Sequence, residues 1–200
     1  VMRAADFLKA AKLGEETGVQ GKRVVVVGGG NVAIDVARMT LRQGASAVQL
    51  VSLESHEMMP AHPQEVAEAE AEGVAFKNSC GIAWFEGEDA VRGVELLQCV
   101  SVYDDTGRFS PQYGEGPIGS IACDVVIVAA GMRPDSGAFG LPVNASGTVQ
   151  VDEGTLQTSV PHVFAAGDVV LGPSMITSAA GQGRRAAFMI DRWLRGEALD

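Results

Sequence analysis

Residues 24–38 read VVVVGGGNVAIDVAR, and this stretch decides the fold. Four β-branched residues in succession are typical of a strand buried on both faces, as in a parallel sheet. Three glycines end the strand, and the apolar residues Ile34, Ala37 and Leu41 predict a helix after them. A strand, a Gly-x-Gly-x-x-Ala turn and a helix, in this order, predict a dinucleotide-binding βαβ unit.

The small residues of the turn each have a predicted purpose. Gly28 permits the tight turn, Gly30 lets a pyrophosphate approach the backbone, and Ala33 lets the helix pack close to the strand. The unpaired N–H groups of the first helical turn, at the positive end of the helix dipole, then bind the phosphates. A turn with a purely structural purpose is the alternative. The residues expected to hold the cofactor here are Gly28, Gly29, Gly30, Asn31 and Val32.

The overall composition excludes several classes of protein. A formal net charge of −10 would repel a nucleic-acid backbone. No apolar run reaches the length of a membrane span, and we expect no signal peptide, because the first residues lack the basic-plus-apolar pattern of one. Cys80, Cys99 and Cys123 form no C-x-x-C or zinc pattern, which predicts reduced thiols in a core. We expect a cytoplasmic protein with no nucleic-acid partner and no membrane span.

Glu54 follows a second strand, which is predicted at about residues 47–53. In a dinucleotide-binding unit, an acid about twenty residues beyond the glycines accepts hydrogen bonds from the adenosine ribose. Glu54 stands where that acid belongs, and its charge would repel the 2′-phosphate of NADPH, which favours NADH. A solvated loop glutamate is the alternative, and Glu57 competes for the same purpose.

The other segments complete an α/β pattern. An amphipathic helix is predicted within residues 1–18, with Ala5, Phe7, Leu8 and Leu13 on its buried side. Gly44 should cap the helix at 31–43. A further helix from Pro63 to Glu72, whose glutamates face water, precedes a strand at 74–76.

The pattern changes after residue 79. Strand-like runs at 82–85, 91–102 and 118–122 predict an antiparallel meander, inserted before a sheet strand at 124–131. Loops rich in glycine and proline follow, and the chain closes with a long small-residue helix from about Met175 to Leu194.

Three motifs point to a known family. They are residues 28–38 (GGGNVAIDVAR) followed by Met59-Pro60, residues 126–134 (VIVAAGMRP), and residues 163–168 (VFAAGD) followed by the segment 175–187. In order and spacing they resemble the flavoprotein reductases of the pyridine nucleotide-disulfide oxidoreductase superfamily. The resemblance is strongest to the small subunit of glutamate synthase and to the flavin portion of dihydropyrimidine dehydrogenase.

The resemblance implies a Rossmann-like NAD(P)-binding domain, with its antiparallel meander, inserted into part of an FAD-binding domain. Residues 1–19 would then be a tail or linker helix of the FAD domain, 20–133 the NAD(P)H-binding domain, and 134–200 the C-terminal part of the FAD domain. The family's other glycine motif and its N-terminal iron–sulfur cysteines are missing from this sequence. We therefore expect a C-terminal fragment with an incomplete FAD site.

Several residue roles are implied only by the resemblance. Gly167 and Asp168 would lie at the ribityl and pyrophosphate part of FAD, although an ordinary Gly-Asp turn is the alternative. The backbone N–H groups of Met175 and Ile176 would face the flavin pyrimidine, unless they are ordinary helix packing. Asp35 aligns with an acid near the nicotinamide, or else complements the helix dipole.

Two further points concern the cofactor. Ala130 and Gly131, at the end of the strand in the second motif, join the expected cofactor-binding residues. Many family members carry two arginines, which hold a 2′-phosphate, where this chain has Leu53-Glu54. Arg38 and Arg42 are near in sequence and could partly offset that loss.

The function implied is passage of a hydride from NADH, with NADPH less favoured, to FAD, and of electrons onward to a protein or iron–sulfur acceptor. The expected partners are the missing N-terminal FAD and iron–sulfur region and a partner redox subunit. We predict no catalytic side chain and no metal ligand, because the cofactors carry the chemistry. The isolated chain should bind NADH but lose most affinity for flavin. A non-catalytic dinucleotide-binding regulatory or assembly module is the alternative.

Overall fold

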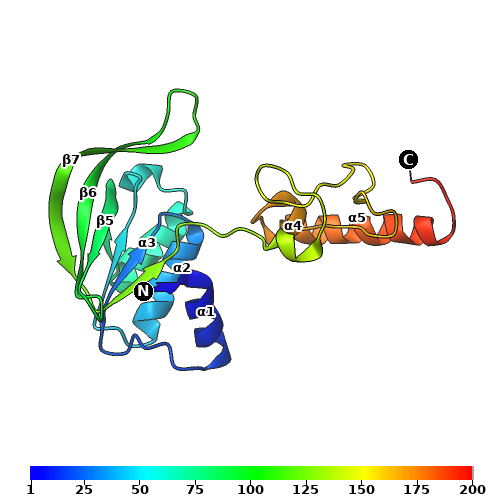
Figure 1. Cartoon of the computed structure of the whole chain (residues 1–200). Coiled ribbons are helices and arrows are strands. Elements are labelled where there is room, and N and C mark those ends of the chain that lie inside the picture. Colours follow the sequence, from blue (N-terminus) through cyan, green and yellow to red (C-terminus); the bar gives the residue numbers. More distant parts are fainter. Residues whose placement is uncertain (200) are drawn as a thin grey trace. The chain divides into compact units, whose positions relative to one another are not determined.

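The computed structural model describes residues 1–199, which form two compact units, 1–131 and 132–199 (Figure 1). Each unit is described by itself. In the described part of the chain, no helix is both long and apolar enough to cross a membrane.

Unit 1 is built on a five-stranded parallel sheet with the order β1-β8-β2-β3-β4. The predicted first strand is confirmed as β2, and its valines Val24, Val25 and Val26 are at most 2% exposed. Neighbouring parallel strands on both sides, with layers on both faces, explain this burial. The strands are β1 (Met2–Arg3), β2 (Arg23–Val27), β3 (Ala47–Val51), β4 (Ala75–Lys77) and β8 (Val125–Val128).

Helices cover one face of this sheet. Val24 and Val26 point into a core shared with the helices, because alternate residues of a strand face opposite sides. The third predicted helix has the expected bounds, with Pro63 in its first turn and Gly73 in the left-handed conformation after its last residue. The helices of this unit are α1 (Ala4–Leu13), α2 (Asn31–Arg42), the 3-10 helix η1 (His56–Met58) and α3 (Pro63–Glu72).

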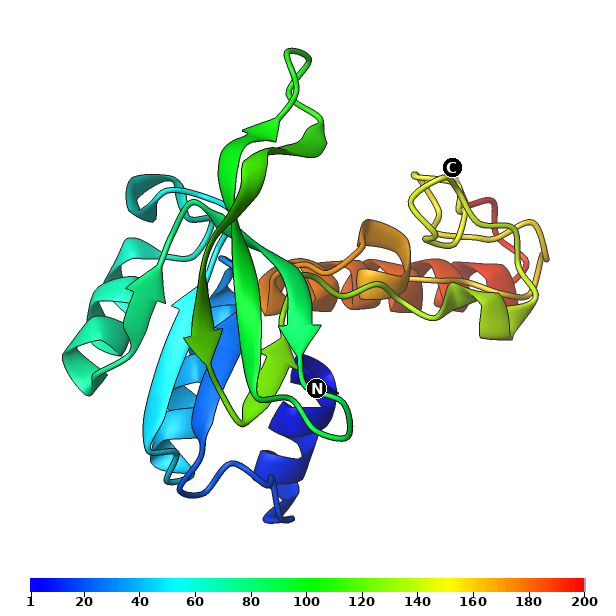
Figure 2. The ribbon, with the colours of Figure 1, turned by 60° about the vertical axis from the view of Figure 1, so that its left-hand side comes forward.

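The predicted antiparallel meander is confirmed and covers the opposite face (Figures 1 and 2). It consists of β5 (Cys80–Glu86), β6 (Gly93–Tyr103) and β7 (Phe109–Ala122), in the order β5-β6-β7. Val25 and Val126 of the parallel sheet form a second core with Val94 and Leu96 of β6. The two cores therefore place the parallel sheet in the middle of three layers.

The N-terminal segment differs from the sequence prediction. Met2–Arg3 joins the sheet as β1, parallel to β8, before the helix begins at Ala4. Ala4 and Phe7 are buried, whereas Ala5 and Leu13, both expected on the buried side, are exposed. The face of α1 that meets the core is therefore the one with Ala4 and Phe7, which differs in part from the predicted face. Segment 1–19 packs within unit 1.

Unit 2 contains little regular structure apart from one long helix. Two isolated antiparallel bridges, Val143 to Val149 and Gln157 to Phe164, shape its loops. Its helices are the 3-10 helix η2 (Ser136–Phe139), the short α4 (Asp168–Leu171), which was not predicted, and α5 (Ile176–Leu194), which was predicted. Among the residues of α5, only Ala186 is buried.

Candidate dinucleotide-binding site

The glycine-rich turn passes between the carboxyl ends of β3 and β8. The Gly28 N–H donates to Val51 O at 2.9 Å, and the Ala129 N–H donates to Val27 O at 2.7 Å. Gly28 has a φ of +143°, and a Cβ placed on it would lie 2.5 Å from Ala129 O. Only glycine fits this position, because the φ is unfavourable for an L side chain and the neighbouring backbone leaves no room.

The start of α2 is open in the way a diphosphate requires. A Cβ placed on Gly30, the N-cap residue, would meet no atom within 4 Å. The backbone N–H groups of Gly30, Asn31 and Val32 have no acceptor within residues 1–199. Ala33 is completely buried, and its Cβ would lie 3.3 Å from a Cβ on Gly28. These residues fit an anionic diphosphate, held by free N–H groups at the positive end of the helix dipole.

Glu54 reaches back over this turn from the loop after β3. A Cβ placed on Gly29 would lie 2.5 Å from Glu54 Oε2 and 3.3 Å from the Cβ of Ser52. Within the described residues, no hydrogen bond or ion pair engages the Glu54 carboxylate. The structure thus brings the predicted ribose acceptor beside the predicted phosphate site and leaves its oxygens available.

Glu57, the competitor for this purpose, is engaged with its own turn. Hydrogen bonds from its own backbone N–H and from the Ser55 hydroxyl hold the pKa of the Glu57 carboxyl below its ordinary value. The geometry therefore favours Glu54 over Glu57 as the acid next to the glycines.

Asn31 connects the glycine turn to the loop that contains Met59-Pro60. Its Oδ1 accepts a hydrogen bond from the His62 N–H at 2.8 Å, and the Ala61 N–H donates to Gly29 O at 3.1 Å. The Asn31 side chain is therefore used to hold the loop, which leaves its backbone N–H as the group open to a ligand. Sequence reasoning missed this link, because the two segments are about 30 residues apart.

Arg38 and Arg42, which were expected to offset in part the loss of the two phosphate-binding arginines, are paired with glutamates of α3 in this structure. Arg38 Nη2 and Arg42 Nη2 each lie 2.6 Å from Glu72 Oε1, and Arg38 Nη1 lies 2.9 Å from Glu68 Oε2. Arg42 is also in the last turn of α2, about 16 Å along the axis from Asn31. The prediction that the glutamates of α3 only face water is incomplete for Glu68 and Glu72, because their ion pairs join α3 to α2.

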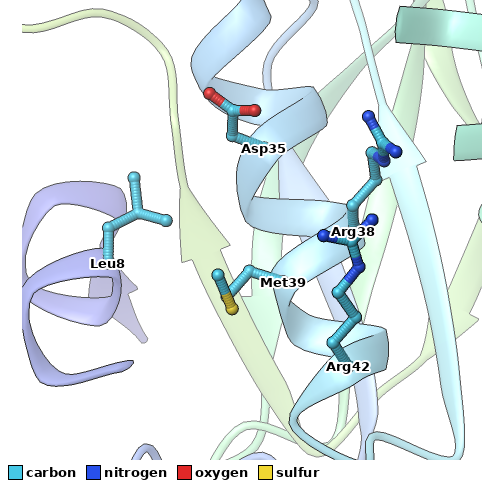
Figure 3. Close-up of a pocket in the computed structure, with 5 residues that line it drawn as sticks. All are labelled: Leu8, Asp35, Arg38, Met39 and Arg42. Atoms are coloured by element: carbon cyan, nitrogen blue, oxygen red, sulfur yellow. The ribbon is translucent and has the colours of Figure 1, made fainter. Parts of the chain in front are cut away.

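Asp35 lies in the second turn of α2, outside the first turn where an acid best complements the helix dipole. Its side chain is exposed and lines a cavity of about 210 Å³ with Leu8 of α1, Met39 and the two arginines (Figure 3). A position near the nicotinamide stays a prediction for this residue.

Ala130 and Gly131 follow β8 at the same edge of the sheet as the glycine turn. Both are exposed, and Gly131 has a φ of +109° with nothing within 4 Å of a Cβ position. Since Ala129 contacts Gly28 directly, these two residues continue from the turn toward the side opposite Glu54.

In unit 2, the predicted Gly167-Asp168 turn is held by two residues that sequence reasoning missed. Gly167 has a φ of +75°, and its N–H donates to Gln182 Oε1 of α5 at 2.7 Å. Asp168 Oδ1 accepts a hydrogen bond from the Ser174 hydroxyl at 2.9 Å. The side chain of Asp168 is thus directed toward the loop that leads into α5.

Met175 and Ile176 lie at the start of α5, as predicted. Met175 is the N-cap residue in extended conformation, and within residues 1–199 the N–H groups of both residues lack an acceptor. Open N–H groups at the start of a helix of 19 residues fit an anionic or carbonyl oxygen of a cofactor.

The three cysteines are free and buried, as predicted. Burial raises the pKa of the thiols of Cys80, Cys99 and Cys123, which is the opposite of what a reactive thiolate needs. They are core residues with no sign of thiol chemistry.

Comparison with known proteins shows the family of this chain. A family model described as pyridine nucleotide-disulphide oxidoreductase matches residues 1–183. The chain is 42% identical over 198 residues to the NADP(+)-dependent formate dehydrogenase subunit beta of Moorella thermoacetica, covering 94% of this chain and 27% of the relative. It is 40% identical over 184 residues to the glutamate synthase [NADPH] small chain of Azospirillum brasilense, covering 89% of this chain and 38% of the relative.

Solved structures share the fold. Thioredoxin reductase of T. acidophilum matches with a TM-score of 0.68 and 25% identity, over 92% of this chain and 55% of that one. FprA of Mycobacterium tuberculosis matches with a TM-score of 0.76 and 17% identity, over 98% of this chain and 59% of that one. At this identity the match shows the fold alone. The chain spans less than two thirds of the length of each of these proteins. The predicted resemblance to the glutamate synthase small subunit is confirmed, and this chain belongs to the pyridine nucleotide-disulphide oxidoreductase family.

Proposed function

We propose that unit 1 binds NADH in preference to NADPH, with the diphosphate on the open N–H groups of residues 30–32 and the adenosine ribose on Glu54. The observation that carries this proposal is the Glu54 carboxylate, which lies over Gly29 with no partner of its own among the described residues. Two like charges 4 Å apart repel by about 1 kcal/mol in water and about 4 kcal/mol near a protein surface. That repulsion would disfavour a 2′-phosphate by about fivefold to a thousandfold.

The names of several relatives contain NADPH or NADP(+). The proposal for this chain departs from those names because of the residues beside the site. Glu54 contributes a negative charge at the position next to the ribose, and Arg38 and Arg42 are paired with glutamates of α3.

For the whole protein, we propose a flavoprotein reductase similar to the glutamate synthase small subunit. FAD, when bound, would accept a hydride from NADH, and the electrons would leave to a protein or iron–sulfur acceptor. Within unit 2, Gly167, Asp168 and the N–H groups of Met175 and Ile176 would hold part of the flavin. Support comes from the family and from relatives that are named as subunits or small chains of larger enzymes. A partner redox subunit and a cytoplasmic location belong to the same proposal.

The test is a titration of the full chain with NADH and with NADPH, followed by tryptophan fluorescence or calorimetry. We expect tighter binding of NADH, and we expect Glu54→Arg to reverse the order of the two dissociation constants. Glu57→Arg is the matched control, since it makes the same charge change on a side chain that is hydrogen-bonded to Ser55 and to its own backbone N–H. Tighter binding of NADPH by the unaltered chain, or an unchanged ratio in Glu54→Arg, would overturn the assignment.

A further inference from the structure

The loop that carries Glu54 is fixed by a polar network that begins at Asn78, just beyond β4. The Asn78 side-chain nitrogen donates to Ser52 Oγ at 2.9 Å and approaches Met59 Sδ at 3.2 Å. A thioether can only accept, so the nitrogen rather than the oxygen of the amide must face Met59. The orientation of the amide is thereby set by its surroundings.

That orientation determines the next hydrogen bond. Because the Asn78 nitrogen donates to Ser52 Oγ, the single hydroxyl hydrogen of Ser52 is free to donate elsewhere. It donates to the Glu54 backbone oxygen at 3.0 Å. Ser52 is only 1% exposed, so water does not compete for this hydroxyl.

The backbone after Asn78 holds the same loop. The Ser79 N–H donates to Glu54 O at 2.9 Å, and the Cys80 N–H donates to Ser52 O at 2.8 Å. Ser79 has a φ of +55°, a left-handed conformation that is uncommon for serine. The Cys99 N–H of β6 donates to Ser79 O at 2.8 Å, which ties this conformation to the meander.

Glu54 therefore has its backbone held firmly and its carboxylate held by nothing within the described residues. Its backbone oxygen accepts two hydrogen bonds, from Ser52 and Ser79, whereas no residue of the described part bonds its carboxylate. The loop therefore fixes the point from which the Glu54 side chain extends toward Gly29, and the Asn78–Ser52 pair supplies one of the two hydrogen bonds to its backbone oxygen.

We propose that Asn78 is a positioning residue for coenzyme discrimination: through Ser52 it places the Glu54 carboxylate where it accepts a ribose and repels a 2′-phosphate. This inference rests on the proposed function, since it assumes that Glu54 meets the adenosine ribose. It also assigns a purpose to the meander, which holds Ser79 against the coenzyme loop.

The test compares the ratio of the NADPH and NADH dissociation constants in variants of the full chain. We expect Asn78→Ala to reduce this ratio by about threefold to tenfold, the loss expected when one hydrogen bond no longer directs a charged group. Ser52→Ala removes the hydroxyl between Asn78 and Glu54 and should reduce the ratio by the same factor. It serves as the second variant in case Asn78→Ala does not fold. Ser101→Ala is the matched control, because its hydroxyl donates to the Tyr103 backbone oxygen and, within the described residues, makes no hydrogen bond to Ser52, Glu54 or Asn78.

The ratio separates positioning from general destabilisation, since a less stable fold weakens both coenzymes by the same factor. Glu54→Gln, measured alongside, distinguishes the two proposals. If Glu54→Gln lowers the ratio whereas Asn78→Ala and Ser52→Ala leave it within twofold, the role of Asn78 is refuted and the proposed function stands. If Glu54→Gln leaves the ratio unmoved, the proposed function itself fails.

Discussion

Arg23 and Asp124 join the amino ends of two neighbouring strands by side chain and backbone together. The Arg23 Nη2 lies 2.8 Å from Asp124 Oδ1, and both Nε and the backbone N–H of Arg23 donate to Asp124 Oδ2, at 3.1 and 2.9 Å. The Asp124 N–H in turn donates to Arg23 O at 2.9 Å. This pair holds the start of β2 next to the start of β8, at the amino ends of the strands, whereas the glycine turn lies at their carboxyl ends.

Asp124→Asn should destabilise unit 1 at neutral pH and much less at low pH. The hydrogen bonds from the Arg23 side chain and backbone hold the pKa of Asp124 well below its ordinary value. A carboxyl with a lowered pKa stabilises the fold above its unfolded pKa, about 4, and loses that contribution as the pH falls further.

Thermal unfolding measured at several pH values checks this expectation. The melting temperature of Asp124→Asn should lie a few degrees below that of the unaltered chain at pH 7, and the two should converge below about pH 4. Asp105→Asn, in the turn between β6 and β7, removes the same charge and should change little. A difference that stays constant down to pH 2 would contradict the role of the Asp124 carboxylate.

Gly28→Ala should be strongly destabilising. The φ of +143° is unfavourable for alanine, and its Cβ would lie 2.5 Å from Ala129 O, which is backbone and cannot move aside cheaply. We expect a loss of about 2 kcal/mol or more in the free energy of unfolding. Urea denaturation of the full chain, followed by circular dichroism, measures it; an unchanged midpoint would show that the turn is less constrained than described.

Gly30→Ala should leave the stability of the fold nearly unchanged and weaken the binding of NADH. Gly30 has a φ of −91°, and its added Cβ would meet no protein atom within 4 Å. Stability should therefore change by less than about 1 kcal/mol. The methyl group would occupy the space where the diphosphate is expected, so binding of NADH should weaken at least about tenfold. Unaltered NADH affinity in a folded Gly30→Ala variant would place the diphosphate elsewhere.

Local signals in the sequence were sufficient for the elements of unit 1 whose ends are marked by particular residues. Helix α3 has its predicted bounds because Pro63 suits a first helical turn and Gly73 adopts the left-handed conformation after the last one. The strand β1 was missed, because two residues have no pattern of their own and pair with Ile127 and Val128, far along the chain.

In the candidate site, too, some features follow from local sequence signals and others from contacts between distant residues. The sequence alone was sufficient to predict the glycine turn and the helix after it, and it placed Glu54 after the second strand, since these depend on backbone conformation and residue order. Only the tertiary structure decided how the polar and charged groups around the site are paired: Arg38 and Arg42 both meet Glu72, and Asn78 donates to Ser52 in the loop that leads to Glu54. Pairings of this kind join residues 26 to 34 positions apart, so they are settled by how the layers pack and not by any local propensity.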